Sequence, residues 1–138
     1  MKNSYKALAI LILNLFLFSI NGKAQNKNMI QIFDFHTTNR CVTCKAIEAN
    51  TKYTLETYFK KELESGKITF KVINIDKEEN QQISEKFYAS GTSLFLNVIN
   101  NGDEKQVDLT QFAFMYGKKQ QEFSEKLKAK LEKQLQKV

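Results

Sequence analysis

Apolar and polar positions alternate in blocks along residues 28 to 138, and four of the apolar blocks predict β-strands. The first block has isoleucine and phenylalanine at both odd and even positions, which predicts a strand buried on both faces. Asn101 and Gly102 separate the last two blocks, and an Asn-Gly pair is typical of a tight hairpin turn. The predicted strands are 29–35, 67–75, 94–99 and 105–109.

Three other segments have the apolar spacing of helices that pack one face on a sheet. The first is predicted to start at or near Cys41 and to run to about Leu63, with Thr38 or Asn39 as its N-cap, and the second is predicted over 78–89. The remainder of the chain after 109 predicts a single C-terminal helical tail. The inward positions are Cys44, Ile47, Thr51, Leu55 and Tyr58 in the first helix and Phe123, Leu127, Leu131 and Leu135 in the tail.

The order of these elements predicts an α/β fold with the sequence β-α-β-α-β-β-α. The first two connections are long enough to return the chain for parallel pairing, whereas the hairpin requires an antiparallel pair. We therefore expect a four-stranded mixed sheet flanked by helices. A chain of 138 residues has room for one such domain.

The segment 1–24 has the pattern of a secretory signal peptide. Two lysines precede an apolar run at 7–20, and the Gly-Lys-Ala triplet at 22–24 places small residues where a signal peptidase reads them. We expect cleavage after Ala24, a mature domain of 25–138, and a periplasmic or secreted location. An uncleaved membrane anchor is the alternative, although the run is shorter than the about 20 residues that span a bilayer.

The charge of the mature chain argues against a nucleic-acid partner. The full sequence has a net charge of +6, and loss of three signal-peptide lysines leaves 18 basic against 15 acidic residues. The lysines are interspersed with glutamates, and Arg40 is the only arginine, so no basic stripe forms. The five glycines form no phosphate-binding loop, and we expect no organic cofactor.

Cys41 and Cys44, the only cysteines, form a C-x-x-C motif where a predicted strand is followed by a predicted helix. In an exported protein such a pair indicates redox chemistry or half of a metal site, because a four-residue loop is too short to add much stability. The helix N-terminus and the adjacent charge of Arg40 favour a thiolate at Cys41. Cys44 faces inward, where burial favours the protonated thiol.

A metal site is the competing interpretation of the same motif. His36, the only histidine, would add a third ligand to Cys41 and Cys44. A closed zinc site needs four ligands, whereas copper(I) needs only the two thiolates. In the other interpretation His36 lies in the loop or at the end of the first strand and hydrogen-bonds to the backbone.

The strand that ends in Asp34-Phe35, the C-x-x-C motif and the later Gly91 segment that leads into the Asn-Gly hairpin together resemble the thioredoxin family over 28–136. The segments HTTNRCVTC (36–44) and FAFMY (112–116) resemble a narrower group, the exported nitrophenyl-compound nitroreductase subunits of the ArsF family. The resemblance implies a thioredoxin-like fold and a thiol–disulfide oxidoreductase. It also implies that the partners are protein thiols or disulfides, or a membrane-bound redox protein.

The resemblance also implies roles for individual residues. Cys41 is the nucleophile, Cys44 resolves the mixed disulfide, and Asp34 is a buried acid that moves protons to and from Cys44. The alternative places Asp34 at a solvated edge or beside a lysine. Ser93, preceded by Thr92, occupies the position of the family's cis-proline, so we expect a trans peptide there. Their hydroxyl groups line the site or form a polar turn. The alternative function is a non-catalytic binding module of the same fold, which carries copper or docks a partner protein.

Overall fold

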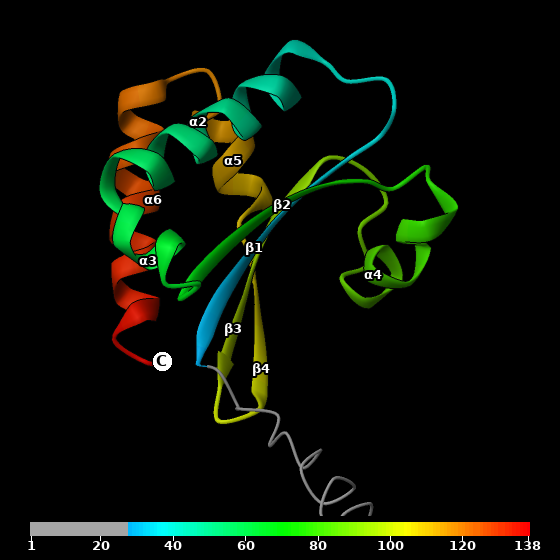
Figure 1. Cartoon of the computed structure of the whole chain (residues 1–138). Helices are drawn as coiled ribbons and strands as arrows, with labels where there is room; N and C mark the ends of the chain where they lie inside the picture. The colour runs from blue at the N-terminus through cyan, green and yellow to red at the C-terminus, as the bar shows by residue number, and fades with distance from the viewer. Residues whose placement is uncertain (1–27) are drawn as a thin grey trace, which may run out of the picture.

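The computed structural model describes residues 28–138, so the predicted signal peptide and its cleavage site lie outside the described residues. Within this range, no helix has both the length and the apolar character needed to cross a membrane. Figure 1 shows the arrangement of the elements. They are β1 (Met29–His36), α2 (Val42–Tyr58), α3 (Lys60–Glu64), β2 (Ile68–Asn74), η2 (Glu78–Asn80), α4 (Gln81–Lys86), β3 (Ser93–Asn100), β4 (Asp103–Asp108), α5 (Thr110–Tyr116) and α6 (Gln120–Leu135).

The four strands form one mixed sheet in the order β2-β1-β3-β4. Strand β1 pairs in parallel with β2 and antiparallel with β3, and β3 pairs antiparallel with β4. Helices cover both faces of this sheet (Figure 1). The prediction of a four-stranded mixed sheet flanked by helices is confirmed, and the arrangement is that of a thioredoxin-like α/β fold.

The second connection does not return the chain for parallel pairing, and that expectation was wrong. Strand β2 ends at Asn74, opposite His36, and β3 begins at Ser93, opposite Phe35. The end of β2 and the start of β3 therefore both lie beside the C-terminal end of β1. Helix α4 has six residues and spans about 9 Å, whereas the seven residues of β2 span about 23 Å. The connection cannot carry the chain back to the other end of the sheet. Strand β3 therefore starts at the end where β2 stops and runs antiparallel to β1.

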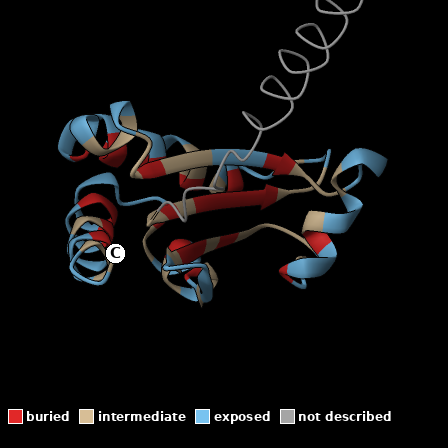
Figure 2. Cartoon of the chain, turned by 60° about the horizontal axis from the view of Figure 1, so that its bottom comes forward, coloured by how far each residue is buried: buried red, intermediate tan, exposed pale blue. Residues whose placement is uncertain are grey.

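Both faces of β1 are buried, as its apolar pattern predicts. Ile30 and Ile32 belong to the larger core cluster, which includes apolar side chains of α2, α5 and α6. Phe33 and Phe35 point to the opposite face and pack with Phe87, which follows α4. Figure 2 shows the buried residues concentrated along the central strands and on the helix faces turned toward them.

The predicted helix 41–63 is divided into α2 and α3 at Phe59. The backbone of Phe59 leaves the helical region, and its buried side chain enters the larger core cluster. The helix begins beside Cys41, as predicted, and Cys41 itself is the N-cap and has an extended backbone. The predicted caps at Thr38 and Asn39 were therefore wrong.

Two more predicted helices differ from the structure in their extent. The segment 78–89 forms η2 and α4 but stops at Lys86, and Tyr88 adopts a left-handed backbone with φ of 51°. The predicted C-terminal tail is two helices, α5 and α6, and the aromatic segment 112–116 lies in α5. The buried positions of α6 are Phe123, Ser124, Leu127 and Leu131.

The hairpin predicted from the Asn-Gly pair joins β3 and β4. Asn101 has a φ of 52° and Gly102 a φ of 91°, so both lie in the left-handed region that a type I′ turn requires. Strands β3 and β4 extend one or two residues beyond their predicted starts. The local turn chemistry was therefore sufficient to locate this part of the sheet.

Candidate functional site

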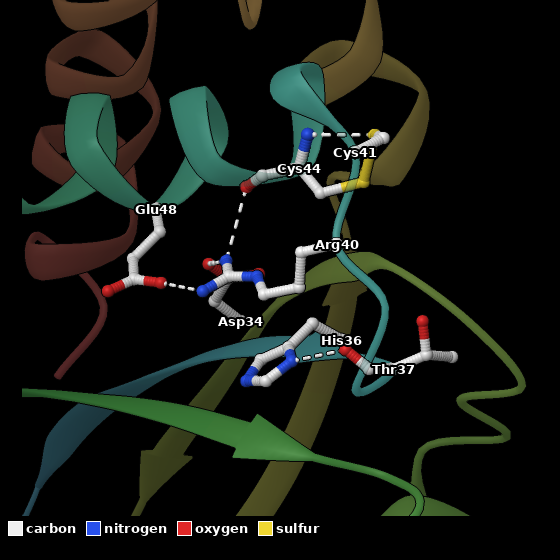
Figure 3. Close-up of polar contacts among 7 residues, drawn as sticks. All are labelled: Asp34, His36, Thr37, Arg40, Cys41, Cys44 and Glu48. Atoms are coloured by element: carbon white, nitrogen blue, oxygen red, sulfur yellow. Dashed lines mark hydrogen bonds and ion pairs between the residues drawn. A yellow bond between two sulfur atoms is a disulfide. The ribbon is translucent and has the colours of Figure 1, made fainter.

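The cysteine pair lies at the N-terminus of α2, after the loop that leaves β1. Cys41 and Cys44 are joined by a disulfide, and their Cα atoms are 5.1 Å apart. The backbone N–H of Cys44 donates a hydrogen bond of 3.1 Å to Sγ of Cys41 (Figure 3). A backbone N–H of the first helical turn, which has no partner within the helix, thus points at the sulfur. This arrangement stabilises a thiolate.

The two sulfur-bearing residues differ in their exposure. Cys41 is exposed, whereas Cys44 is only 7% exposed and belongs to the buried face of α2. Val42, between them, is 77% exposed. No acidic residue is present in the first turn of α2 to oppose a negative charge on Cys41. Cys41 is therefore the more accessible of the two cysteines.

The side chain of Arg40 runs beneath α2 instead of standing free beside Cys41 (Figure 3). Its Nη1 donates a hydrogen bond to Oε2 of Glu48, and its Nη2 donates one of 3.2 Å to the carbonyl oxygen of Cys44. The same Nη2 lies 3.8 Å from Oδ2 of Asp34. Arg40 therefore connects the backbone of the second cysteine to two carboxylates.

Asp34 is buried in the middle of the sheet, with 0% exposure. Neither of its carboxyl oxygens accepts a hydrogen bond from any residue in 28–138. Burial raises the pKa of Asp34 to about 7, Arg40 opposes this increase, and the negative charge of Glu48 adds to it. The alternative that placed Asp34 at a solvated edge or beside a lysine was wrong, since its nearest cation is Arg40.

His36 is the last residue of β1 and is half-buried. Its Nδ1 donates a hydrogen bond of 2.8 Å to the carbonyl oxygen of Thr37, as the strand-end interpretation requires. Among the described residues, no three His, Cys, Asp or Glu side chains come together in a metal-binding arrangement. The structure thus does not gather His36, Cys41 and Cys44 into a ligand set.

Thr92 and Ser93 are half-buried at the start of β3. Ser93 is opposite Phe35 of β1, and its hydroxyl donates a hydrogen bond of 3.3 Å to the carbonyl oxygen of Gly91. No peptide bond between residues 28 and 138 is cis, as expected for this position. The hydroxyl of Ser93 is thus engaged within its own turn.

Glu48 and Asp76 are part of this region, although the sequence analysis does not identify them. Glu48 lies one helical turn after Cys44, a spacing that places both on one side of α2. Asp76 accepts a hydrogen bond of 2.6 Å from the backbone N–H of Thr38, and this contact holds the pKa of Asp76 below its usual 3.8. It also ties the loop before Cys41 to the end of β2.

Comparisons with known proteins leave the family of this chain unassigned and give only distant structural similarity. No protein-family model matches the sequence, and no curated protein matches it. A structure described as that of a malarial protein has 16% identity and a TM-score of 0.41, over 64% of this chain and 94% of its own.

Two thioredoxins are similar at the same level. Mitochondrial thioredoxin 3 from Saccharomyces cerevisiae, in its oxidised form, has 17% identity and a TM-score of 0.43, over 67% of this chain and 78% of its own. The germline-specific thioredoxin Deadhead from Drosophila melanogaster has 20% identity and a TM-score of 0.42, over 78% of this chain and 93% of its own. On its own strand order and cysteine geometry, the described chain is a thioredoxin-like α/β domain with a C-x-x-C disulfide at the N-terminus of α2.

Proposed function

We propose that this protein is an exported thiol–disulfide oxidoreductase that acts on the thiols and disulfides of other proteins. The observation that carries the proposal is the asymmetry of the pair, since Cys41 is exposed at a helix N-terminus and Cys44 is buried one turn inward. This asymmetry supports Cys41 as the attacking sulfur and Cys44 as the resolving one. The export rests on the signal-peptide pattern of 1–24.

In the reducing direction, the Cys41 thiolate attacks one sulfur of a substrate disulfide. A Cys41–substrate bond forms, and the other substrate sulfur leaves as a thiolate that takes up a proton. Cys44 then loses its proton and attacks Sγ of Cys41, which closes the Cys41–Cys44 disulfide and releases the second substrate thiol. Two electrons pass from the protein to its substrate, and the oxidising direction is the reverse sequence.

Asp34 is the group that we assign to the proton of Cys44. It is buried, and Arg40 links it to the Cys44 carbonyl. Burial raises the pKa of Asp34 to about 7, so both the protonated and the ionised form of its carboxyl group are populated near neutral pH. It can therefore accept a proton when the disulfide closes and return it when the disulfide opens.

The proposal also includes the narrower protein group to which the chain belongs and the kind of partner on which it acts. Segments 36–44 and 112–116 support membership of the exported nitroreductase-subunit group, and the exposed Cys41 suits a protein partner, including one held in a membrane. The chemistry that we propose rests on the cysteine pair and not on that group's label.

The first experiment is the reduction potential of the Cys41–Cys44 pair, measured in the mature protein by equilibration with glutathione and thiol trapping. A reversible couple between about −270 and −120 mV, the range of this fold, is the expected result. A pair that cannot be reduced without unfolding, or that binds metal instead of oxidising, would place the protein among binding modules.

Matched single-cysteine variants test the assigned roles. Cys44→Ser leaves an exposed thiol, which is expected to accumulate a stable mixed disulfide with a model disulfide substrate. Cys41→Ser leaves only the buried thiol, which is expected to react far more slowly. Equal rates for the two variants would refute the assignment of Cys41 as the attacking sulfur.

A further inference from the structure

The contacts of Arg40 divide one cation between two carboxylates. The guanidinium is hydrogen-bonded to Glu48, whereas it approaches Asp34 only to 3.8 Å and donates no hydrogen bond to it. A full Arg–carboxylate pair is bidentate and shorter than this. Glu48 therefore has the stronger contact, although Asp34 is the more deeply buried acid.

The position of Glu48 follows from the helix. It lies four residues after Cys44, so its side chain projects over the same side of α2 as the Cys44 carbonyl, where Arg40 is bound (Figure 3). The Arg40 side chain is only 17% exposed, so little water competes for the guanidinium. Its Nε has no partner among the described residues, which shows that its hydrogen bonds are made only through the two terminal nitrogens.

Within residues 28–138, Asp34 has uncharged neighbours across the sheet, and the nearby charged or titratable side chains other than Arg40 and Glu48 are engaged elsewhere. Its neighbours across the sheet are Val72 on β2 and Leu94 on β3, both uncharged. His36 lies two residues along the same strand and bonds to the carbonyl of Thr37. On α2, Lys52 pairs with Glu56 at 3.9 Å. The charges that act on Asp34 are therefore those of Arg40 and Glu48.

We propose that Glu48 is a positioning residue of the redox site, which holds the Arg40 guanidinium away from Asp34 and thereby lets Asp34 carry a proton while the Cys41–Cys44 disulfide is closed. This inference rests on the proposed function, because a protonated Asp34 matters to the cysteines only if they exchange disulfides. Without Glu48, Arg40 is free to turn its terminal nitrogens to Asp34 and form a direct pair, which favours the carboxylate. Asp34 would then have no proton to return to the Cys44 thiolate when the disulfide opens.

The test is the titration of Asp34 in the oxidised mature protein, followed by carbon-13 NMR of its carboxyl group. Glu48→Gln is expected to lower the midpoint of the Asp34 titration by about one pH unit or more. An adjacent arginine lowers the pKa of an aspartate by about one to three pH units. Glu56→Gln is the matched control on the same helix, since Glu56 is 61% exposed and contacts Lys52 instead of Arg40. The control is expected to leave the midpoint unchanged.

A second variant shows whether Glu48 acts through Arg40 or by its own charge. Arg40→Gln removes the cation and is expected to raise the midpoint of Asp34. Adding Glu48→Gln to Arg40→Gln is then expected to change the midpoint much less than Glu48→Gln alone. Equal changes in both backgrounds, or no change on Glu48→Gln in a folded protein with its disulfide formed, would overturn the proposal.

The reduction potential separates this inference from the proposed function. In the wild type, the pH dependence of the potential is expected to bend near the Asp34 midpoint, and in Glu48→Gln the bend is expected to move to lower pH. A wild-type pair with no reversible couple sinks the proposed function, whatever the titration shows. A reversible couple whose bend stays in place in Glu48→Gln overturns the role of Glu48 alone.

Discussion

The buried carboxyl group of Asp34 should make the stability of the protein depend on pH in an unusual direction. Its pKa is raised by burial to about 7 in the folded protein and is 3.8 when unfolded. Between these values the folded state binds the proton that the unfolded state has released. The free energy of unfolding therefore falls as the pH rises through this interval, and it levels off above about pH 7.

The size of the effect follows from the difference between the two values. The two pKa values differ by about three pH units, and each unit is equivalent to about 1.4 kcal/mol. The free energy of unfolding therefore falls by about 4 kcal/mol in total as the pH rises through this interval. Domains of this size are stable by about 5–15 kcal/mol, so the loss is a large fraction of the whole. Asp76 and Glu104 have lowered pKa values and act at more acidic pH.

Urea unfolding of the oxidised wild type and of Asp34→Asn, at about pH 5 and about pH 8.5, measures this contribution. The amide cannot ionise, so the stability advantage of Asp34→Asn over the wild type is expected to grow by about 3 kcal/mol between the two pH values. The comparison cancels the titration of every other group that both proteins share. If the two proteins show the same pH dependence, Asp34 does not titrate as a buried acid and the reasoning fails.

Three backbone and packing sites provide further tests by thermal or urea unfolding. Gly117→Ala is expected to destabilise by about 1–3 kcal/mol, because its Cβ would meet the Ala113 carbonyl oxygen at 2.7 Å. Gly91→Ala, with nothing within 4 Å, is the control, and equal losses would contradict this account. Gly102→Ala should cost about 1–2 kcal/mol because φ is 91°, and an unchanged midpoint would exclude a left-handed turn. Asn50→Ala should cost about 1–3 kcal/mol, because its buried amide donates to the Gly117 carbonyl at 2.8 Å, and a neutral effect would argue that the bond is not formed.

Much of the fold could be predicted because its signals are local. The alternation in β1 specified a strand buried on both faces, and the Asn101-Gly102 pair specified the turn that joins β3 and β4. The cysteine motif could also be placed at a helix start from its neighbours alone. These features depend on residues close together in the chain.

The features that could not be predicted depend on distant contacts. Phe59 interrupts a helical pattern because the core accepts its side chain, and the pattern alone does not contain that information. The direction of β3 depends on how little distance α4 covers. In the site, the pairing of Arg40 with Glu48 depends on the path of the loop after β1, which is fixed in part by the contact of Thr38 with Asp76.

The position of Asp34 is itself an argument about function. It lies on the central strand among apolar side chains, and neither of its oxygens accepts a hydrogen bond within the described chain, so ionisation there costs free energy that an apolar side chain would not. A sequence selected for stability alone has no reason to keep an acid at this position. The same acid is joined through Arg40 to the backbone of the buried cysteine. A departure from good packing that coincides with the cysteine pair supports our proposal that Asp34 serves the chemistry of Cys41 and Cys44.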